Sequence, residues 1–171
     1  MEQPRGYSIW ILPQDELSRT LKKIITRLSI ENDGPIFDPH VTIIGEIEKT
    51  EKELIRETSK LASNTIPFEI ELTSIDYLNE YFRSIFIRAK KTESITTTNL
   101  KAQHILWNKQ TQEYMPHLSI MYGNVTIDKK KKIIASINER FSKRFDVRSL
   151  FLFSTQGDPT EWYKVKEFSL R

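Results

Sequence analysis

The chain has 171 residues, enough for one domain or two small, closely packed lobes with a buried core. Hydrophobic residues make up 38% and charged residues 29%, and no window is apolar enough for a signal peptide or a membrane span, so a cytoplasmic protein is expected. The lack of cysteine excludes disulfides, thiolate nucleophiles and zinc–thiolate sites. The net charge of +3 suits an anionic substrate without by itself indicating nucleic-acid binding.

The first half of the chain alternates strands and helices and then forms a hairpin. Thr50, with Glu53 three residues later, is a capping box that predicts a helix start. Asn79 and Glu80 predict a tight hairpin turn. The expected elements are a strand at 7–12, a helix at 15–30, a strand at 40–44 that ends at Gly45, a helix from 50 to about 61, and strands at 66–78 and 81–90.

The second half repeats this order. Residues 129–132 are all lysine, and we expect this charge run to be a solvated helix face, with Ile133, Ile134 and Ile137 turned inward. The expected elements are a helix at 92–107, a strand at 117–122, a helix at 126–141, and strands at 145–155 and 161–170 joined by a turn at 157–159.

Two matching pentapeptides dominate the sequence. Residues 39–43 read Pro-His-Val-Thr-Ile and residues 116–120 read Pro-His-Leu-Ser-Ile, 77 positions apart, and they hold two of the three histidines. Alternation along a strand puts His40 and Thr42 on one face and the apolar residues between them on the other. His117 and Ser119 repeat the arrangement, so a fold that joins the two strands would gather two imidazoles and two hydroxyls.

The same shift of 77 positions aligns the surrounding segments. Phe68 falls on Phe145, Ile70 on Val147, and the helix near 51–61 on the one near 128–138. We therefore predict a single domain over 1–171 built from a duplicated unit, with repeats at about 14–90 and 92–170 that form one lobe each, after a first strand at 7–12.

Two histidines on opposite sides of a reaction centre form a general base and a general acid. This pairing suits in-line displacement at phosphorus, with the hydroxyls of Thr42 and Ser119 donating to non-bridging phosphate oxygens. One motif alone is typical of an ordinary packed strand, whereas the pair of motifs indicates a catalytic site. Two histidines this far apart without a third ligand make a poor metal site, so we expect neither a metal nor a cofactor.

These motifs resemble those of the 2H phosphoesterase superfamily, and within it the cyclic phosphodiesterases of the plant and yeast type. The supporting stretches are Tyr7-Ser8-Ile9-Trp10 with Leu12-Pro13, Gly34-Pro35-x-Phe37-x-Pro39-His40, Tyr114-Met115-Pro116-His117-Leu118-Ser119 with Tyr122, and Glu161-Trp162. The resemblance spans almost the whole chain.

The resemblance implies an α+β, bilobal fold in which two pseudo-symmetric lobes of antiparallel sheet line a central cleft, with helices outside. It also implies metal-independent hydrolysis of ribose cyclic phosphates: ADP-ribose 1″,2″-cyclic phosphate to the 1″-phosphate, or nucleoside 2′,3′-cyclic phosphates to 2′-phosphates, as in the metabolism of RNA and of tRNA-splicing by-products. By resemblance, His40 and His117 are the acid/base pair, Thr42 and Ser119 hold the phosphate, and Tyr122 lies at the substrate cleft.

Other aromatic residues are weaker candidates. Phe82 at the hairpin tip is a candidate for stacking on the base or ribose, and Tyr114 either contacts substrate or anchors the loop before the strand. Trp10 is expected in the core rather than as a base platform. His104, in the middle of a predicted helix and without the motif, is read as structural or surface.

Several alternatives stay open at this point. One is an RNA 2′,3′-cyclic phosphodiesterase or 2′–5′ RNA ligase-like enzyme, which would favour a broad basic groove for an RNA end, whereas the charge here is mixed. Another is activity on nucleotide second messengers. A third is a non-catalytic nucleotide-binding module, which would not need both proton carriers. A monomer without membrane contact is expected in each case.

Overall fold

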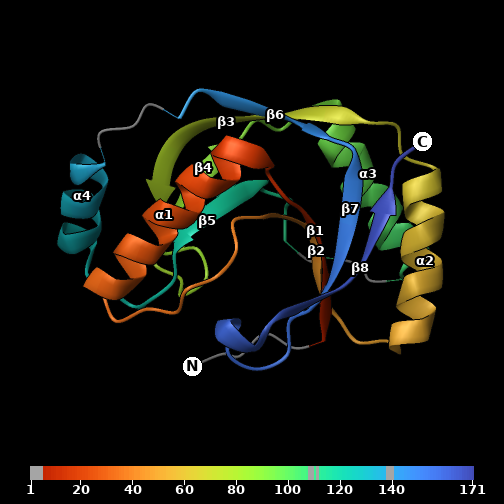
Figure 1. The fold of residues 1–171 in the computed structure, drawn as a ribbon, viewed down its shortest axis with the longest axis horizontal. Helices are drawn as coiled ribbons and strands as arrows, with labels where there is room; N and C mark the ends of the chain where they lie inside the picture. The colour runs from red at the N-terminus through yellow and green to blue at the C-terminus, as the bar shows by residue number, and fades with distance from the viewer. Residues whose placement is uncertain (1–5, 108–109, 111, 138–140) are drawn as a thin grey trace.

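The computed structural model describes residues 6–107, 110, 112–137 and 141–171. It is an α+β fold in which an antiparallel sheet curls strongly, with α1 and α4 toward one end of the curl and α2 and α3 toward the other (Figure 1). The strands are β1 (Tyr7–Ile11), β2 (Val41–Ile47), β3 (Phe68–Tyr77), β4 (Ile85–Ala89), β5 (His117–Met121), β6 (Lys143–Val147), β7 (Ser149–Ser154) and β8 (Tyr163–Ser169). The helices are α1 (Asp15–Glu31), α2 (Glu51–Ser63), α3 (Glu93–Ile105), α4 (Ile127–Ser136) and the short 3-10 helix η1 (Pro159–Glu161).

The sheet has the order β6-β3-β4-β5-β2-β1-β7-β8, so the two motif strands β2 and β5 lie at its centre. Counted outward from this centre, β4 matches β1, β3 matches β7 and β6 matches β8. The half that carries His40 contains β2, β1, β7 and β8, and the half that carries His117 contains β5, β4, β3 and β6. Each half thus takes strands from both predicted repeats.

This order corrects the prediction that the repeats at 14–90 and 92–170 form one lobe each. The hairpin of β3 and β4 comes from the first repeat but pairs with β5 of the second, and the hairpin of β7 and β8 pairs with β1. The predicted first strand is the counterpart of β4 in the sheet. The physical reason is that backbone pairing joins strands that are distant in sequence, which a linear repeat does not specify.

The helices cover the apolar face of the curled sheet. Alternate residues of the motif strands, Val41 and Ile43 on β2 and Leu118 and Ile120 on β5, are fully buried in this core. Helix α1 packs on β5 and α3 on β2, and the buried Asn99 side chain of α3 donates to the Ile43 carbonyl at 2.7 Å. The polar residues between these apolar positions are therefore turned to the opposite face.

Local signals predicted most element starts. The capping box of Thr50 and Glu53 is present at α2, and Thr92 and Thr126 cap α3 and α4. Helix α3 is shorter than the predicted 92–107. Helix α4 ends at Ser136, and the part of the predicted helix at 138–140 lies outside the described residues.

Three strand boundaries differ from the prediction. Strand β2 runs past Gly45 to Ile47, because an irregular register against β1 accommodates the glycine and the left-handed Glu46 (φ 55°). The connection from β3 to β4 is the longer loop 78–84 rather than a tight turn at 79–80, and its ends are closed by the Leu78 amide donating to the Arg83 carbonyl. The predicted strand 145–155 breaks at Arg148 into β6 and β7, which belong to different halves of the sheet.

The lysine run 129–132 is a solvated helix face as predicted at Lys129, Lys131 and Lys132, which are exposed, but not at Lys130. Its side chain is buried, with 1% exposed, and its Nζ donates to the Leu78 carbonyl at 2.7 Å. Burial lowers the pKa of this lysine, and the hydrogen bond compensates part of the lost hydration. Lys130 thereby fastens α4 to the loop 78–84.

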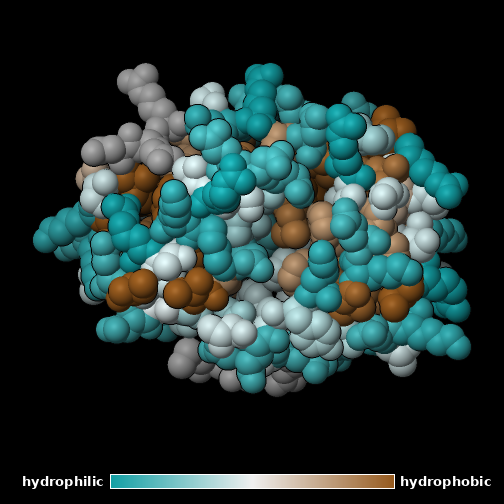
Figure 2. Space-filling view, viewed as in Figure 1, coloured by the Kyte–Doolittle hydropathy of each residue, from teal (hydrophilic) through white to brown (hydrophobic). Residues whose placement is uncertain are grey.

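The outer surface seen from the side of Figure 1 is mostly hydrophilic, with hydrophobic residues in separate small groups (Figure 2). Within the described part of the chain, no helix has both the length and the apolar character that crossing a bilayer requires.

Candidate active site

The central strands bring the four motif side chains together. Val41 of β2 pairs with Leu118 of β5 in an antiparallel register. This register places His40 opposite Ser119 and Thr42 opposite His117, on the face turned away from the helices. Each imidazole therefore has the hydroxyl of the other motif as its cross-strand neighbour, and all four residues line one pocket.

The two imidazole rings are held in the same way. Nδ1 of His40 lies 2.7 Å from the Asp38 carbonyl oxygen, and Nδ1 of His117 lies 2.8 Å from the Met115 carbonyl oxygen. A carbonyl oxygen only accepts, so Nδ1 carries the hydrogen in both rings, and Nε2 is left as the nitrogen available for proton exchange. Each motif thus positions its own imidazole through a carbonyl two residues upstream.

His40 lies in an aromatic stack. Its ring is stacked on the indole of Trp10 with centroids 3.6 Å apart and planes 9° from parallel, and Trp10 stacks on Phe153 at 4.0 Å. Burial lowers the pKa of His40 to about 4, although the Asp38 carbonyl acts in the opposite direction. Trp10 belongs to a small aromatic cluster, as the core prediction suggested, but it also lines the pocket.

His117 has different neighbours. The ring of Phe86 meets it edge-on, with centroids 5.2 Å apart, and Phe86 pairs with Ser119 as Trp10 pairs with Thr42. Burial lowers the pKa of His117, and the charges of Arg83 and Arg88 act in the same direction. Arg88 is itself paired with Asp76 on β3.

The two hydroxyls are not equivalent. Ser119 Oγ donates to the Phe82 carbonyl at 2.8 Å and so ties the loop 78–84 to β5. The Thr42 hydroxyl makes no hydrogen bond with any described residue. Ser119 must therefore exchange a protein acceptor for a ligand acceptor before it holds a phosphate, whereas Thr42 does not.

The pocket has a volume of about 180 Å³, below the range of about 300–1,000 Å³ that is usual for ligand pockets. It therefore fits a phosphate and the sugar that carries it better than a large ligand. Its lining combines the motif residues with aromatic and small polar side chains: Ser8, Trp10, His40, Thr42, Gly45, Glu46, Phe82, His117, Ser119, Tyr122, Thr155 and Trp162.

The predicted candidates Tyr122 and Phe82 lie in this lining, with ring centroids 5.1 Å apart. Tyr122 is buried and stacks on Phe37 at 3.7 Å, so it forms a rigid part of the wall, and burial raises the pKa of its phenol. Trp162 was not proposed for the site from the sequence. Its only signal was the Glu161-Trp162 stretch that contributed to the family resemblance.

Tyr114 and His104 lie apart from the pocket. The Tyr114 hydroxyl donates to the Thr42 carbonyl at 2.9 Å, so this side chain anchors the motif strand β2 from the loop before β5. His104 is exposed on α3, where its ring contacts that of Trp107. Of the two roles considered for Tyr114, the geometry favours the anchor.

No group of three or more His, Cys, Asp or Glu side chains arranged to hold a metal ion occurs among the residues that the structure describes. The two imidazoles in the pocket have Nδ1 engaged with carbonyls, which leaves one nitrogen each. Proton transfer is the chemistry that this donor set supports best.

Comparisons with known proteins bear on the family and the fold. A sequence profile described as cyclic phosphodiesterase-like protein matches residues 5–170. A protein of Arabidopsis thaliana named cyclic phosphodiesterase is 26% identical over 125 residues, which cover 73% of this chain and 69% of that protein. Among solved structures, TT0787 of Thermus thermophilus has a TM-score of 0.72 at 14% identity, covering 97% of this chain and 98% of that one. E. coli LigT complexed with 3′-AMP has a TM-score of 0.64 at 13% identity, covering 98% and 99%. The chain therefore belongs to the cyclic phosphodiesterase-like protein family.

Proposed function

We propose that the protein is a cyclic phosphodiesterase that hydrolyses ribose cyclic phosphates in the pocket between His40 and His117. The observation that carries the proposal is the crosswise arrangement of two imidazoles and two hydroxyls around one small volume. The substrates are ADP-ribose 1″,2″-cyclic phosphate, nucleoside 2′,3′-cyclic phosphates, or both. The family membership and the relative named cyclic phosphodiesterase support the reaction class.

The reaction is an in-line displacement at phosphorus. Nε2 of one histidine accepts a proton from water as the water oxygen bonds to phosphorus, and the phosphorus–oxygen bond to one ribose oxygen breaks. Nε2 of the other histidine gives its proton to that leaving oxygen, which becomes a hydroxyl. The product keeps the phosphate as a monoester, and the two histidines have exchanged protonation states.

The protonation states follow from burial. Both histidine pKa values are lowered in the ligand-free protein, so both rings are neutral near pH 7 and a base is ready. A bound cyclic phosphate carries a negative charge, and an opposite charge at close range favours the protonated imidazole. The substrate therefore itself promotes protonation of the histidine that acts as the acid.

Thr42 and Ser119 stabilise the negative charge that develops on the phosphoryl oxygens. Their hydroxyls donate to the non-bridging oxygens in the pocket between the two motif strands. The chemistry needs no metal ion in this scheme, because the acid, the base and the two neutral donors supply the charge stabilisation.

An RNA end is the second candidate substrate, and E. coli LigT, whose fold is similar, has been crystallised with 3′-AMP.

A product-resolved assay tests the function. ADP-ribose 1″,2″-cyclic phosphate, the four nucleoside 2′,3′-cyclic phosphates, an RNA with a cyclic phosphate end and a 3′,5′-cyclic nucleotide are each incubated with the protein, with and without EDTA. We expect turnover of at least one ribose cyclic phosphate to a monoester, and we expect it to survive EDTA. Lack of turnover of every substrate would refute the reaction, and activity lost in EDTA and restored by a divalent ion would refute the metal-free scheme.

A further inference from the structure

Two aromatic side chains flank the pocket from the loops that follow the matching strands β3 and β7. Phe82 lies in the loop between β3 and β4, and Trp162 follows η1 in the connection between β7 and β8. Their ring centroids are 6.3 Å apart and their planes 32° from parallel, while both rings are steeply inclined to Tyr122. Both are only half-buried, so their surfaces are open to a ligand.

The rings of Phe82 and Trp162 lie close enough to the proposed phosphate position that a single ribose could connect a phosphate there to a base stacked on them. The Trp162 ring centroid is 6.5 Å from that of His40, and the Phe82 carbonyl is 2.8 Å from Ser119 Oγ. In a nucleoside 2′,3′-cyclic phosphate the base is attached to the same ribose that carries the phosphate. In ADP-ribose 1″,2″-cyclic phosphate that ribose carries no base, and the adenine lies beyond a diphosphate and a second ribose.

The indole of Trp162 is held in place before any ligand binds. Asp158 and Glu161 cap η1 reciprocally, and the Trp162 Nε1 donates to the Gly157 carbonyl at 3.4 Å. Gly157 has a φ of 79°, and a Cβ atom there would lie 2.5 Å from the Glu161 carboxylate, so the turn requires glycine. A stacking surface that is already ordered loses little side-chain entropy on binding.

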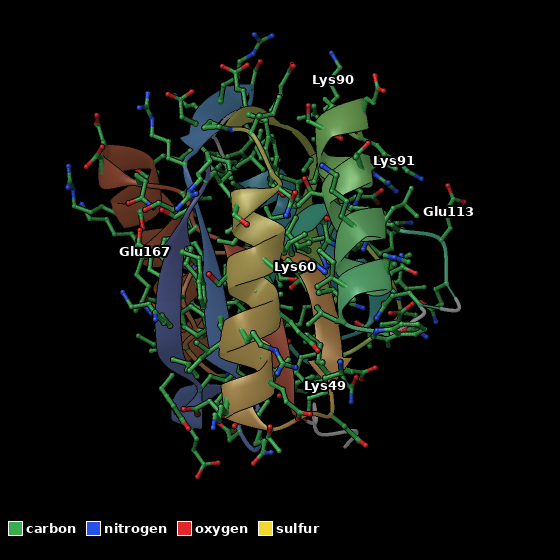
Figure 3. All side chains as sticks on the ribbon, turned by 90° about the vertical axis from the view of Figure 1, so that its right-hand side faces the viewer. Lys49, Lys60, Lys90, Lys91, Glu113 and Glu167 are labelled. Carbon is green, nitrogen blue, oxygen red and sulfur yellow. The ribbon has the colours of Figure 1, made fainter. Side chains whose placement is uncertain are left out.

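The charges around the pocket do not favour a diphosphate. Among the described residues of the lining, Glu46 is the one charged side chain apart from the histidines. Arg83, near His117, is paired with Glu80. The lysines labelled in Figure 3 lie on or beside α2 and α3, on the helical side of the sheet, and Lys49, Lys90 and Lys91 are paired with carboxylates.

We infer that Phe82 and Trp162 form a stacking subsite for a nucleobase carried by the same ribose as the cyclic phosphate. The site then takes nucleoside 2′,3′-cyclic phosphates in preference to ADP-ribose 1″,2″-cyclic phosphate. The inference rests on the proposed function for the position of the phosphate. Stacking on aromatic faces tolerates every base, so the subsite selects for the presence of a base more than for its identity.

The kinetic test compares Trp162→Ala with the wild type on three substrates: adenosine 2′,3′-cyclic phosphate, ADP-ribose 1″,2″-cyclic phosphate, and the methyl riboside 2,3-cyclic phosphate, which has no base. We expect kcat/KM for the adenosine compound to fall about tenfold to a hundredfold, while the two others change less than about twofold. Trp162→Phe should restore most of the loss. Trp107→Ala, which removes a tryptophan with 85% of its surface exposed, is the matched control. Equal losses on all three substrates, or no loss on the adenosine compound, would overturn the subsite.

A binding measurement separates this inference from the proposed function. In a Trp107→Phe background, we expect adenosine 2′-phosphate to quench tryptophan fluorescence, and ribose phosphate to do so much less. The difference should disappear when Trp162 is also changed to Phe. Quenching that does not depend on the base refutes the subsite even in an active enzyme, and base-dependent quenching supports it even if no cyclic phosphate is hydrolysed.

Discussion

His40 and His117 occupy equivalent places in the two halves of the sheet, but the walls around them differ. On the His40 side the wall is the stack of Trp10 and Phe153, and the ring is 6% exposed. On the His117 side Phe86 meets the ring by its edge, the ring is partly open, and the ion pair of Arg88 and Asp76 lies on the neighbouring strands. Backbone symmetry thus repeats the position of each imidazole, while the neighbouring side chains set its acidity.

The hydroxyls repeat the contrast. Thr42 is ready to donate to a ligand, whereas Ser119 already donates to the loop that carries Phe82. Lys130 holds the same loop from outside at Leu78, and the Gly123 amide holds it at Tyr81. The half that carries His117 is therefore connected to the loop 78–84, and in the proposed function phosphate binding at Ser119 competes with a protein contact.

The largest expected effect comes from removing either histidine. His40→Ala and His117→Ala should each lower kcat by about 10²–10⁴-fold, because each transfers a proton in the same step. Steady-state rates on the best substrate of the assay above give the measurement. His104→Ala, a change at the exposed third histidine, should leave kcat unaltered. If one of the two motif variants kept near-wild-type activity, the two halves would not share the chemistry.

A second comparison concerns the hydroxyls. Thr42→Val and Ser119→Ala should each lower kcat by about 10²–10³-fold, the usual cost of one lost donor to a developing oxyanion. Because Ser119→Ala also frees the Phe82 carbonyl, only this variant should alter the protection of the loop 78–84 in hydrogen exchange. Unchanged exchange in that loop would show that the Ser119 contact does not hold it.

The third comparison concerns acidity. NMR titration of the histidine ring protons should place His40 near pH 4 and His117 below 6.5. Trp10→Leu should raise the pKa of His40 and leave that of His117 in place, and Phe86→Leu should act on His117 instead, because burial is the main cause in both cases. If His40 still titrated near pH 4 in the Trp10→Leu protein, groups other than Trp10 would be the cause of its lowered pKa.

The lowered pKa also makes stability depend on pH. His40 is neutral in the folded protein down to about pH 4 but binds a proton below about 6.5 once the chain unfolds, so the free energy of unfolding falls as the pH falls through this window. The difference corresponds to at most about 3 kcal/mol. Denaturant unfolding at pH 7 and pH 4.5 measures it, and His40→Gln should lose less stability between these values than His104→Gln does.

Much of the site followed from local sequence. The alternation of His40, Val41 and Thr42, and of His117, Leu118 and Ser119, predicted which side chains would share a face, because side-chain direction in a strand depends only on position along it. The capping box at Thr50 and the apolar spacing of α1 were equally local. The duplication added the expectation that the two motifs meet, and β2 and β5 are neighbours in the sheet.

The tertiary structure decided everything that depends on partners distant in sequence. Strand pairing placed the hairpin of each predicted repeat in the half of the sheet that carries the motif strand of the other repeat. It also divided the segment 145–155 at Arg148 into two strands and placed Trp10 against His40. The packing of α4 against the loop 78–84 buries Lys130 within a run of lysines, and the connection between β7 and β8 places Trp162 in the pocket. A sequence pattern reports the period of an element, but it does not report which element lies across from it. The two motifs alone therefore determined the candidate reacting groups, and the tertiary structure determined their acidity and the lining of the pocket around them.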